Sequence, residues 1–178
     1  MRKLILAVAV SVVISISSIA AQQSSNDRKD KAQSAEVLCP VHDAHSKMNE
    51  RGEKGMGFSQ TATTHHFFLK PDGGVIQVEA NSAADAANRD NIRMHLTHIA
   101  KAFANGDFDI PMFVHDTVPP DVPEMKRLRE KIRYSFEETP TGGRVVIATA
   151  DKDSLTAIHK FLRFQIEEHK TGDPTEIP

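Results

Sequence analysis

The chain has 178 residues, with 22 Lys and Arg against 24 Asp and Glu, nine His, one Cys and no Trp. This length fits one ordinary domain. The near-neutral charge and the absence of any basic run argue against nucleic acid as a partner, because phosphate neutralisation needs clustered Lys and Arg. A single cysteine excludes an intrachain disulfide framework.

The first twenty residues predict export. Arg2 and Lys3 precede an uncharged run over 4–21 that ends in Ser18-Ile19-Ala20, a small-x-small site suited to cleavage after Ala20. Residues 1–20 are therefore interpreted as a secretory signal peptide, and the mature protein as periplasmic or secreted. The alternative is an uncleaved membrane anchor, since the apolar run approaches the length of a bilayer span. Beyond this segment no membrane contact is predicted.

The mature chain divides into three parts by composition. Residues 21–36 are polar and lack apolar periodicity, which is typical of a flexible tether. Residues 37–57 form a segment rich in His and Met that also holds Cys39, and we expect it outside the main core. Residues 58–174 form the predicted folded domain.

The first half of that domain begins with a predicted β-hairpin. The β-rich runs TATTHHFFLK (61–70) and VIQVEA (75–80) flank the turn Pro71-Asp72-Gly73-Gly74. A helix over 83–104 follows, which Asn81 or Ser82 would cap and Asn105-Gly106 would end. Its apolar positions recur at helical spacing: Ile92, Leu96, Ile99 and Phe103.

The segment over 109–124 contains four prolines, so it is predicted to cross the domain without a long element, apart from a short strand at 112–114. Asp121 then caps a short helix that reaches about residue 131. The hairpin pattern recurs in IRYSFEE, a turn over 139–143 and RVVIATA. A second long helix follows, with Asp151 or Asp153 as its cap and an apolar face of Leu155, Ile158, Leu162 and Ile166.

These elements predict an α+β fold. Two β-hairpins form an antiparallel sheet, and the two long helices cover one of its faces. The two halves share the same order of elements, which indicates either an internal duplication or a chance similarity of two ββα units. The open face of the sheet would suit a protein partner or a second copy of the chain.

Histidine and methionine dominate the candidate site residues. Seven of the nine histidines precede residue 116, and imidazole and thioether groups together suit copper, with soft sulfur favouring Cu(I). On the predicted strand His65 points inward and His66 outward. His95 borders the apolar helix face with His98 one step around it, so both can approach one ligand. The predicted metal site is therefore His65, His95 and His98 with help from Met56 or His115. The alternative is that His95 is a core-edge histidine and His98 is solvated.

A second group of donors precedes the domain. Cys39, His42, His45 and Met48 lie within ten residues of one another. The run CPVH resembles the start of the heavy-metal-binding segment of exported copper and zinc resistance proteins, with matches at Cys39, Pro40 and His42. The second cysteine pair of that segment is missing. Cys39, His42 and His45 are predicted as auxiliary ligands, and the alternative is that Cys39 is incidental.

No common enzyme motif is present: the chain lacks G-x-S-x-G, HExxH, a P-loop and G-x-G-x-x-G. The runs MGFSQTATTHHFFL, RMHLTHIAKAF and IHKFLRFQIEEHKTGD resemble a family of uncharacterised exported bacterial proteins over about residues 48–173. The resemblance implies export and assigns no activity.

We therefore expect an exported protein that binds a transition metal ion, copper before zinc, for sequestration or delivery and not for turnover. The alternative is a non-catalytic binding module that uses the open sheet face or the Phe-rich C-terminal helix. Its partner would be a protein, a small ligand or a second copy in a homodimer. A small metal-dependent enzyme is the third reading.

Overall fold

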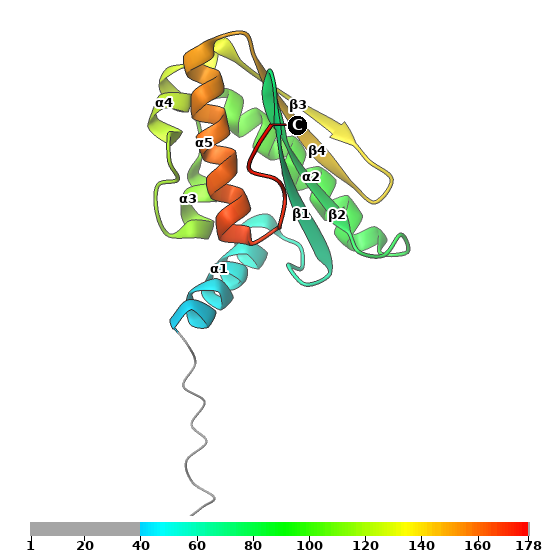
Figure 1. Ribbon diagram of the computed structural model, residues 1–178. Helices are drawn as coiled ribbons and strands as arrows, with labels where there is room; N and C mark the ends of the chain where they lie inside the picture. Colours follow the sequence, from blue (N-terminus) through cyan, green and yellow to red (C-terminus); the bar gives the residue numbers. More distant parts are fainter. Residues whose placement is uncertain (1–39, 178) are drawn as a thin grey trace, which may run out of the picture. The chain divides into compact units, whose positions relative to one another are not determined.

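The computed structural model describes residues 40–177, with side chains from residue 45 onward. The predicted signal peptide, the tether and Cys39 lie outside the described residues, and so does the side chain of His42. The described part of the chain is one compact unit built from five α-helices, one 3-10 helix and a four-stranded sheet (Figure 1).

The first half of the chain forms a helix, a hairpin and a second helix. Helix α1 (Pro40–Met56) precedes strands β1 (Thr63–Lys70) and β2 (Gly73–Ala80), and helix α2 (Ala86–Ala104) follows. The strands pair antiparallel with Phe67 opposite Ile76, so the predicted first hairpin is confirmed. Phe67 and Leu69 are buried on β1 while Lys70 is exposed, which is the alternation expected of a strand with one covered face.

The second half repeats the hairpin and the long helix. Two short helices, α3 (Asp109–His115) and α4 (Val122–Arg127), lead through a 3-10 turn (Arg129–Lys131) to β3 (Ile132–Glu138) and β4 (Gly142–Thr149). Helix α5 (Lys152–His169) ends the regular structure. The second hairpin and the second long helix therefore lie where the sequence predicts them.

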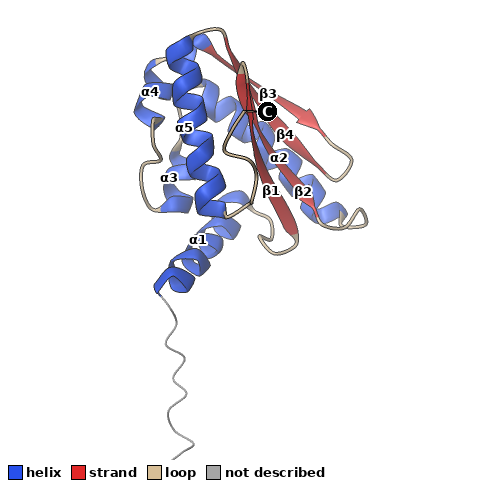
Figure 2. Ribbon diagram, viewed as in Figure 1, coloured by secondary structure: helices blue, strands red, loops and turns tan. Residues whose placement is uncertain are grey.

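The strand order is β1-β2-β4-β3, so the second strand of each hairpin lies at the centre of the sheet. All neighbouring pairs are antiparallel. Helix α2 packs mainly on β4 and β3, whereas α5 packs on β1 and β2 (Figure 2). Each half thus covers the strands of the other half, and this confirms the α+β fold class with both long helices on one sheet face.

The core fills the space between the helices and the inward positions of the strands. Phe103 of α2 stacks on Phe108 with ring centroids 4.3 Å apart, and Phe161 of α5 meets both rings edge-on. Gly74 faces the same layer, where a Cβ would overlap Leu162 Cδ1 and lie 2.7 Å from the Phe68 carbonyl oxygen. The missing side chain therefore lets α5 approach the sheet closely.

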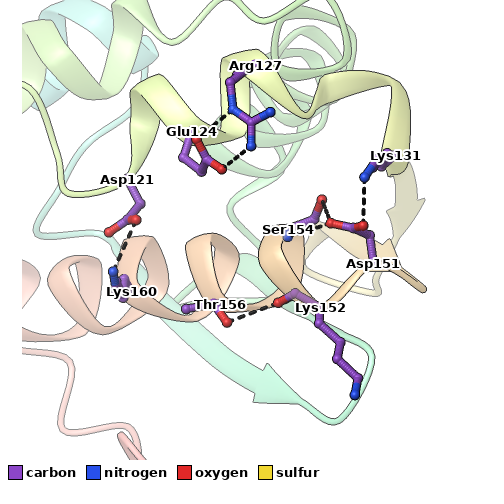
Figure 3. A network of polar contacts seen from close by, with 9 residues as sticks. All are labelled: Asp121, Glu124, Arg127, Lys131, Asp151, Lys152, Ser154, Thr156 and Lys160. Atoms are coloured by element: carbon purple, nitrogen blue, oxygen red, sulfur yellow. Dashed lines mark hydrogen bonds and ion pairs between the residues drawn. The ribbon is translucent and has the colours of Figure 1, made fainter.

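Helix α5 begins at a well-bonded N-cap. The Asp151 carboxylate accepts hydrogen bonds from Ser154 N at 3.0 Å and from Ser154 Oγ at 2.9 Å (Figure 3). Lys131 Nζ donates to the same carboxylate at 2.7 Å, and Lys160 further along α5 pairs with Asp121 at 3.2 Å. These bonds satisfy donors that a helix N-terminus otherwise leaves free, and they tie α5 to the turn before β3.

Helix α3 and the start of helix α2 differ from the sequence prediction, and the short helix predicted to reach about residue 131 ends at Arg127. The predicted strand at 112–114 lies inside helix α3, where Pro111 falls in the first turn and removes no intrahelical hydrogen bond. Helix α2 begins at Ala86 and not at residue 83, because Asp85 is its N-cap and accepts from Asn88 N at 3.1 Å. The side chain of Asn81 bonds to Thr64 instead, at 2.6 Å.

Helix α1 covers most of the segment 37–57, which the sequence places outside the main core. In the structure it packs against α3, where Arg51 Nε donates to the Val114 carbonyl oxygen at 2.8 Å. Met48 is only 4% exposed. Gly55 lets the helices meet, since a Cβ there would lie 3.2 Å from the Phe113 ring. The residues from 45 to 56 are thus part of the packed domain.

The segment after α5 runs back beside β1 (Figure 1). Asp173 accepts a hydrogen bond from Phe67 N at 2.9 Å, and its other oxygen lies 3.0 Å from His66 Nδ1. This contact covers part of an otherwise open strand edge. None of the described helices has the length and apolar content needed to cross a bilayer.

Candidate functional site

Four histidine side chains converge on one cavity, and we call them the histidine cluster: His65 on β1, His95 on α2, and His115 and His169, the last residues of α3 and α5. The cavity has a volume of about 60 Å³. This is room for a metal ion and bound water, since about 10–15 Å³ holds one water molecule. Met56 at the end of α1 also lines it. The remaining lining is Gln165 and apolar side chains: Phe67, Ile76, Val78, Leu96, Ile99, Phe103, Ile110, Pro111, Val114 and Phe161.

The rings of the cluster lie close together. The centroid of His169 is 5.3 Å from that of His65 and 5.0 Å from that of His115. Phe58 lies against both His65 and His95, with centroid distances of 5.8 and 5.5 Å. A metal–nitrogen bond of about 2.0–2.1 Å places imidazole centroids roughly 5 Å apart in a tetrahedral site. The same spacing is ordinary for packed rings, and the rings of His65 and His169 are stacked with an interplanar angle of 15°.

The rings of the cluster are not oriented as ligands of one ion. Within the described residues, no group of three or more His, Cys, Asp or Glu side chains is arranged as a metal-binding set. To share one ion, the rings would have to turn about their side-chain torsions. His65 packs against Phe58, Phe67 and His169, so rotation of its ring displaces those neighbours.

Two ring nitrogens of the cluster are buried without a hydrogen-bond partner among the described residues. They are Nε2 of His65 and Nδ1 of His115. Most buried polar atoms in folded proteins are hydrogen-bonded, so each exception asks for an explanation. Both nitrogens belong to residues that line the same cavity, so they are candidates to bind a metal ion there.

Burial keeps the cluster uncharged. It lowers the pKa of His65 to about 4 and that of His95 to about 4, and the charges of neighbouring histidines lower both further. The pKa of His169 is held well below its usual value, mainly by burial and then by His65 and His115. Burial also lowers the pKa of His115, against the opposing effect of its hydrogen bond to Gln165. The four imidazoles are therefore neutral at neutral pH.

The predicted ligands divide between the cavity and the rest of the molecule. His65, His95, His115 and Met56 line the cavity. His98 is exposed on α2 and does not line it, because it lies about 60° further around the helix than His95 from the buried face. Half-buried His45 on α1 lies close enough to His169 to lower the pKa of that ring. Cys39 and the side chain of His42 lie outside the described residues.

The sequence analysis did not predict His169. A helical spacing in the sequence could have identified it, because Phe161, Gln165 and His169 stand at i, i+4 and i+8. This spacing continues the buried face of α5 to its last residue. Two exposed glutamates precede it and hide the periodicity. Gln165 was also missed, since an amide in a charged stretch gives no pattern of its own.

The other described histidines have structural partners. His159 Nε2 donates to the carbonyl oxygens of Lys70 at 2.9 Å and Gly73 at 3.0 Å, and so it holds the β1–β2 turn against α5. His66 points away from the cavity and bonds to Asp173. These two rings are not candidates for the site.

The phenylalanine side chains of α5 pack inside the domain. Phe161 is 1% exposed in the core, and the ring of Phe164 lies edge-on to His115 at 4.9 Å. The outer sheet face carries half-buried Phe68 and Val146, and no described helix covers it. A partner on that face, including a second copy of the chain, stays a prediction.

Comparisons of this chain with protein-family models, with curated proteins and with solved structures find no match. The resemblance to exported bacterial proteins stays a prediction.

Proposed function

We propose that this protein binds one transition metal ion, copper before zinc, at the histidine cluster, with Met56 as an additional thioether ligand. Its role is to sequester or deliver the ion outside the cytoplasm. The observation that carries the proposal is the convergence of four neutral imidazoles, from four different elements, on one small cavity.

The donor set selects the class of metal. Imidazole suits copper, zinc, iron and nickel, whereas calcium and magnesium prefer oxygen ligands. No Asp or Glu is among the described residues that line the cavity. The Met56 thioether adds a soft donor, which favours copper, and Cu(I) in particular, over zinc.

The protonation state supports binding. A histidine must be neutral to bind a metal ion, so protons normally compete with the metal. Because burial lowers the pKa of His65 and His95 to about 4, this competition is weak down to mildly acidic pH. The cluster would therefore keep its affinity where ordinary surface histidines lose theirs.

The size of the cavity supports storage or transfer over catalysis. About 60 Å³ is far below the roughly 300–1,000 Å³ typical of small-molecule sites. An ion with water fits inside the cavity, whereas an organic substrate would have to extend out of it, since the cavity is partly open to solvent. A metal-dependent enzyme is therefore the weaker alternative.

The test is a Cu(I) titration of the full chain, made without a His-tag and freed of metal, against a chromophoric Cu(I) chelator under anaerobic conditions. We expect one Cu(I) per chain. His65→Ala and His169→Ala should each weaken binding at least about tenfold, since each removes a ligand. His98→Ala is the matched control and should bind like the wild type.

Two results would overturn the proposal. One is a wild-type chain that binds neither Cu(I) nor Zn(II) at micromolar concentrations. The other is an equal loss of affinity in His98→Ala, which would move the site to the surface of α2. A Cys39→Ser variant measures the contribution of the segment before the domain, and a loss larger than that of His169→Ala would place the main site there.

A further inference from the structure

Gln165 and His115 form a buried pair at the inner wall of the cavity. Gln165 is 4% exposed and His115 is 9% exposed. Oε1 of Gln165 lies 2.9 Å from Nε2 of His115. Phe164 and His169 lie edge-on to the ring of His115, with centroids 4.9 and 5.0 Å away, so the ring is held on several sides.

This hydrogen bond determines which nitrogen of His115 can bind a metal. In the amide orientation of the structure, Oε1 of Gln165 faces His115 and only accepts, so Nε2 of His115 carries the proton, while the amide nitrogen of Gln165 is itself buried without a partner among the described residues. The proton-free nitrogen of the neutral ring is then Nδ1, the atom that is buried without a partner among the described residues. Metal-binding histidines are usually fixed in this way, with the second ring nitrogen donating to an oxygen acceptor.

The acceptor carries no charge, as when a metal-bound histidine donates to a backbone carbonyl. Metal-bound histidines often donate to a carboxylate, which offsets part of the charge of a divalent ion. Here the acceptor is the neutral amide of Gln165. When the histidines are neutral, none of the described residues that line the cavity carries a charge. The charged groups that act on the pKa of His115 are Glu168, which raises it, and Arg51, which lowers it. A divalent ion would therefore bring two uncompensated charges into an apolar cavity.

We propose that Gln165 determines the specificity of the site: it presents Nδ1 of His115 to the cavity without adding charge, so that the site accepts a monovalent soft cation, Cu(I), in preference to Zn(II). Burying a single charge without a counter-ion costs less than burying two. The inference rests on the proposed function, since it concerns the ion that occupies the histidine cluster. Gln165 is a positioning residue that acts through His115.

The first test needs no metal. In the metal-free protein, long-range ¹H–¹⁵N NMR of the histidine rings should show His115 with its proton on Nε2 and a free Nδ1. His115→Gln assigns the signal. In Gln165→Met, which keeps the volume and removes the acceptor, the ring should show a mixture of the two tautomers. A proton on Nδ1 in the wild type, or an unchanged Gln165→Met spectrum, would refute the positioning role.

The second test measures the ratio of Zn(II) to Cu(I) affinity by competition with chelators for each ion. Gln165→Glu supplies the missing charge and should raise this ratio at least about tenfold. Gln165→Met should weaken both ions about tenfold and leave the ratio within a few-fold of the wild type. Gln77→Glu adds the same charge on the outer sheet face, opposite Arg144 and in place of the amide that donates to Glu79, and should leave both affinities unchanged.

The outcomes separate this inference from the proposed function. If the wild type binds Cu(I) at the cluster but Gln165→Glu leaves the affinity ratio unchanged, the specificity role is refuted and metal binding stands. If the wild type prefers Zn(II), the specificity role also fails. If the wild type binds neither ion, both proposals fail, whatever the tautomer of His115.

Discussion

The metal-free protein should lose stability as the pH falls from 6.5 towards 4, because its histidine cluster is buried in the neutral form. In the unfolded chain, His65 and His95 bind protons at the ordinary pKa of 6.5, whereas in the folded protein their pKa is about 4. Between these values the unfolded state binds more protons, so the free energy of unfolding rises with pH. The full contribution is present above pH 6.5, and the loss is complete below about pH 4.

The size of the effect follows from the two pKa values. At pH 5 each of these histidines should lower the free energy of unfolding by about 2 kcal/mol relative to pH 7.5. His65 and His95 together then account for about 4 kcal/mol, a large share of the 5–15 kcal/mol that typically stabilises a domain. His115 and His169 act in the same direction. Carboxylates contribute little in this range, since at pH 5 they are ionised in both states.

Urea denaturation of the chelator-treated protein at pH 7.5 and pH 5.0 measures this difference. His95→Gln should reduce the pH dependence by about 2 kcal/mol, because one buried proton acceptor is removed. His98→Gln changes an exposed histidine of the same helix and should have a much smaller effect, since His98 is only the last of the causes that lower the pKa of His95. Equal stability of the wild type at the two pH values would refute the reasoning, and so would an equal effect of the two substitutions.

Three further predictions concern the fold and the metal. Asp151→Asn should lower the melting temperature measured by thermal circular dichroism, because the N-cap of α5 loses its charge and its ion pair with Lys131. Asp153→Asn changes an exposed residue in the same turn and should have a smaller effect. Gly74→Ala should cost about 1–3 kcal/mol in urea denaturation, since its Cβ would overlap Leu162, and an unchanged midpoint would contradict the close packing of α5. Met56→Leu should weaken Cu(I) about tenfold and leave Zn(II) nearly unchanged, because only the soft ion gains from the thioether; equal losses for both ions would remove Met56 from the ligand set.

The fold was predictable where local patterns agree with burial. The hairpins and long helices carry regular apolar spacing and recognisable turns, so the α+β class followed from the sequence. Helix α3 was missed because prolines normally end helices, whereas Pro111 lies in a first turn that tolerates it. The cap of α2 was misplaced because several polar residues precede it, and only the structure shows that Asp85 accepts the bond.

The candidate site was predictable only in part. The strand pattern placed His65 inward, and the helix stripe placed His95 at its edge. Joining these rings to His115 and His169 requires knowing that α5 packs on β1 and that the end of α3 contacts α5. Such tertiary proximity leaves no trace in the spacing of the residues. The hydrogen bond from His115 to Gln165 is hidden for the same reason.

X-ray absorption at the copper edge, on the full chain loaded with one equivalent of Cu(I), tests metal binding at the histidine cluster most directly. The spectrum should show nitrogen neighbours at about 2.0 Å with the outer-shell scattering of imidazole rings. Both features should weaken in a His65→Ala, His169→Ala double variant and persist in His98→Ala. A sulfur-dominated spectrum without imidazole scattering, or copper removed by gel filtration, would contradict a metal site at the cluster.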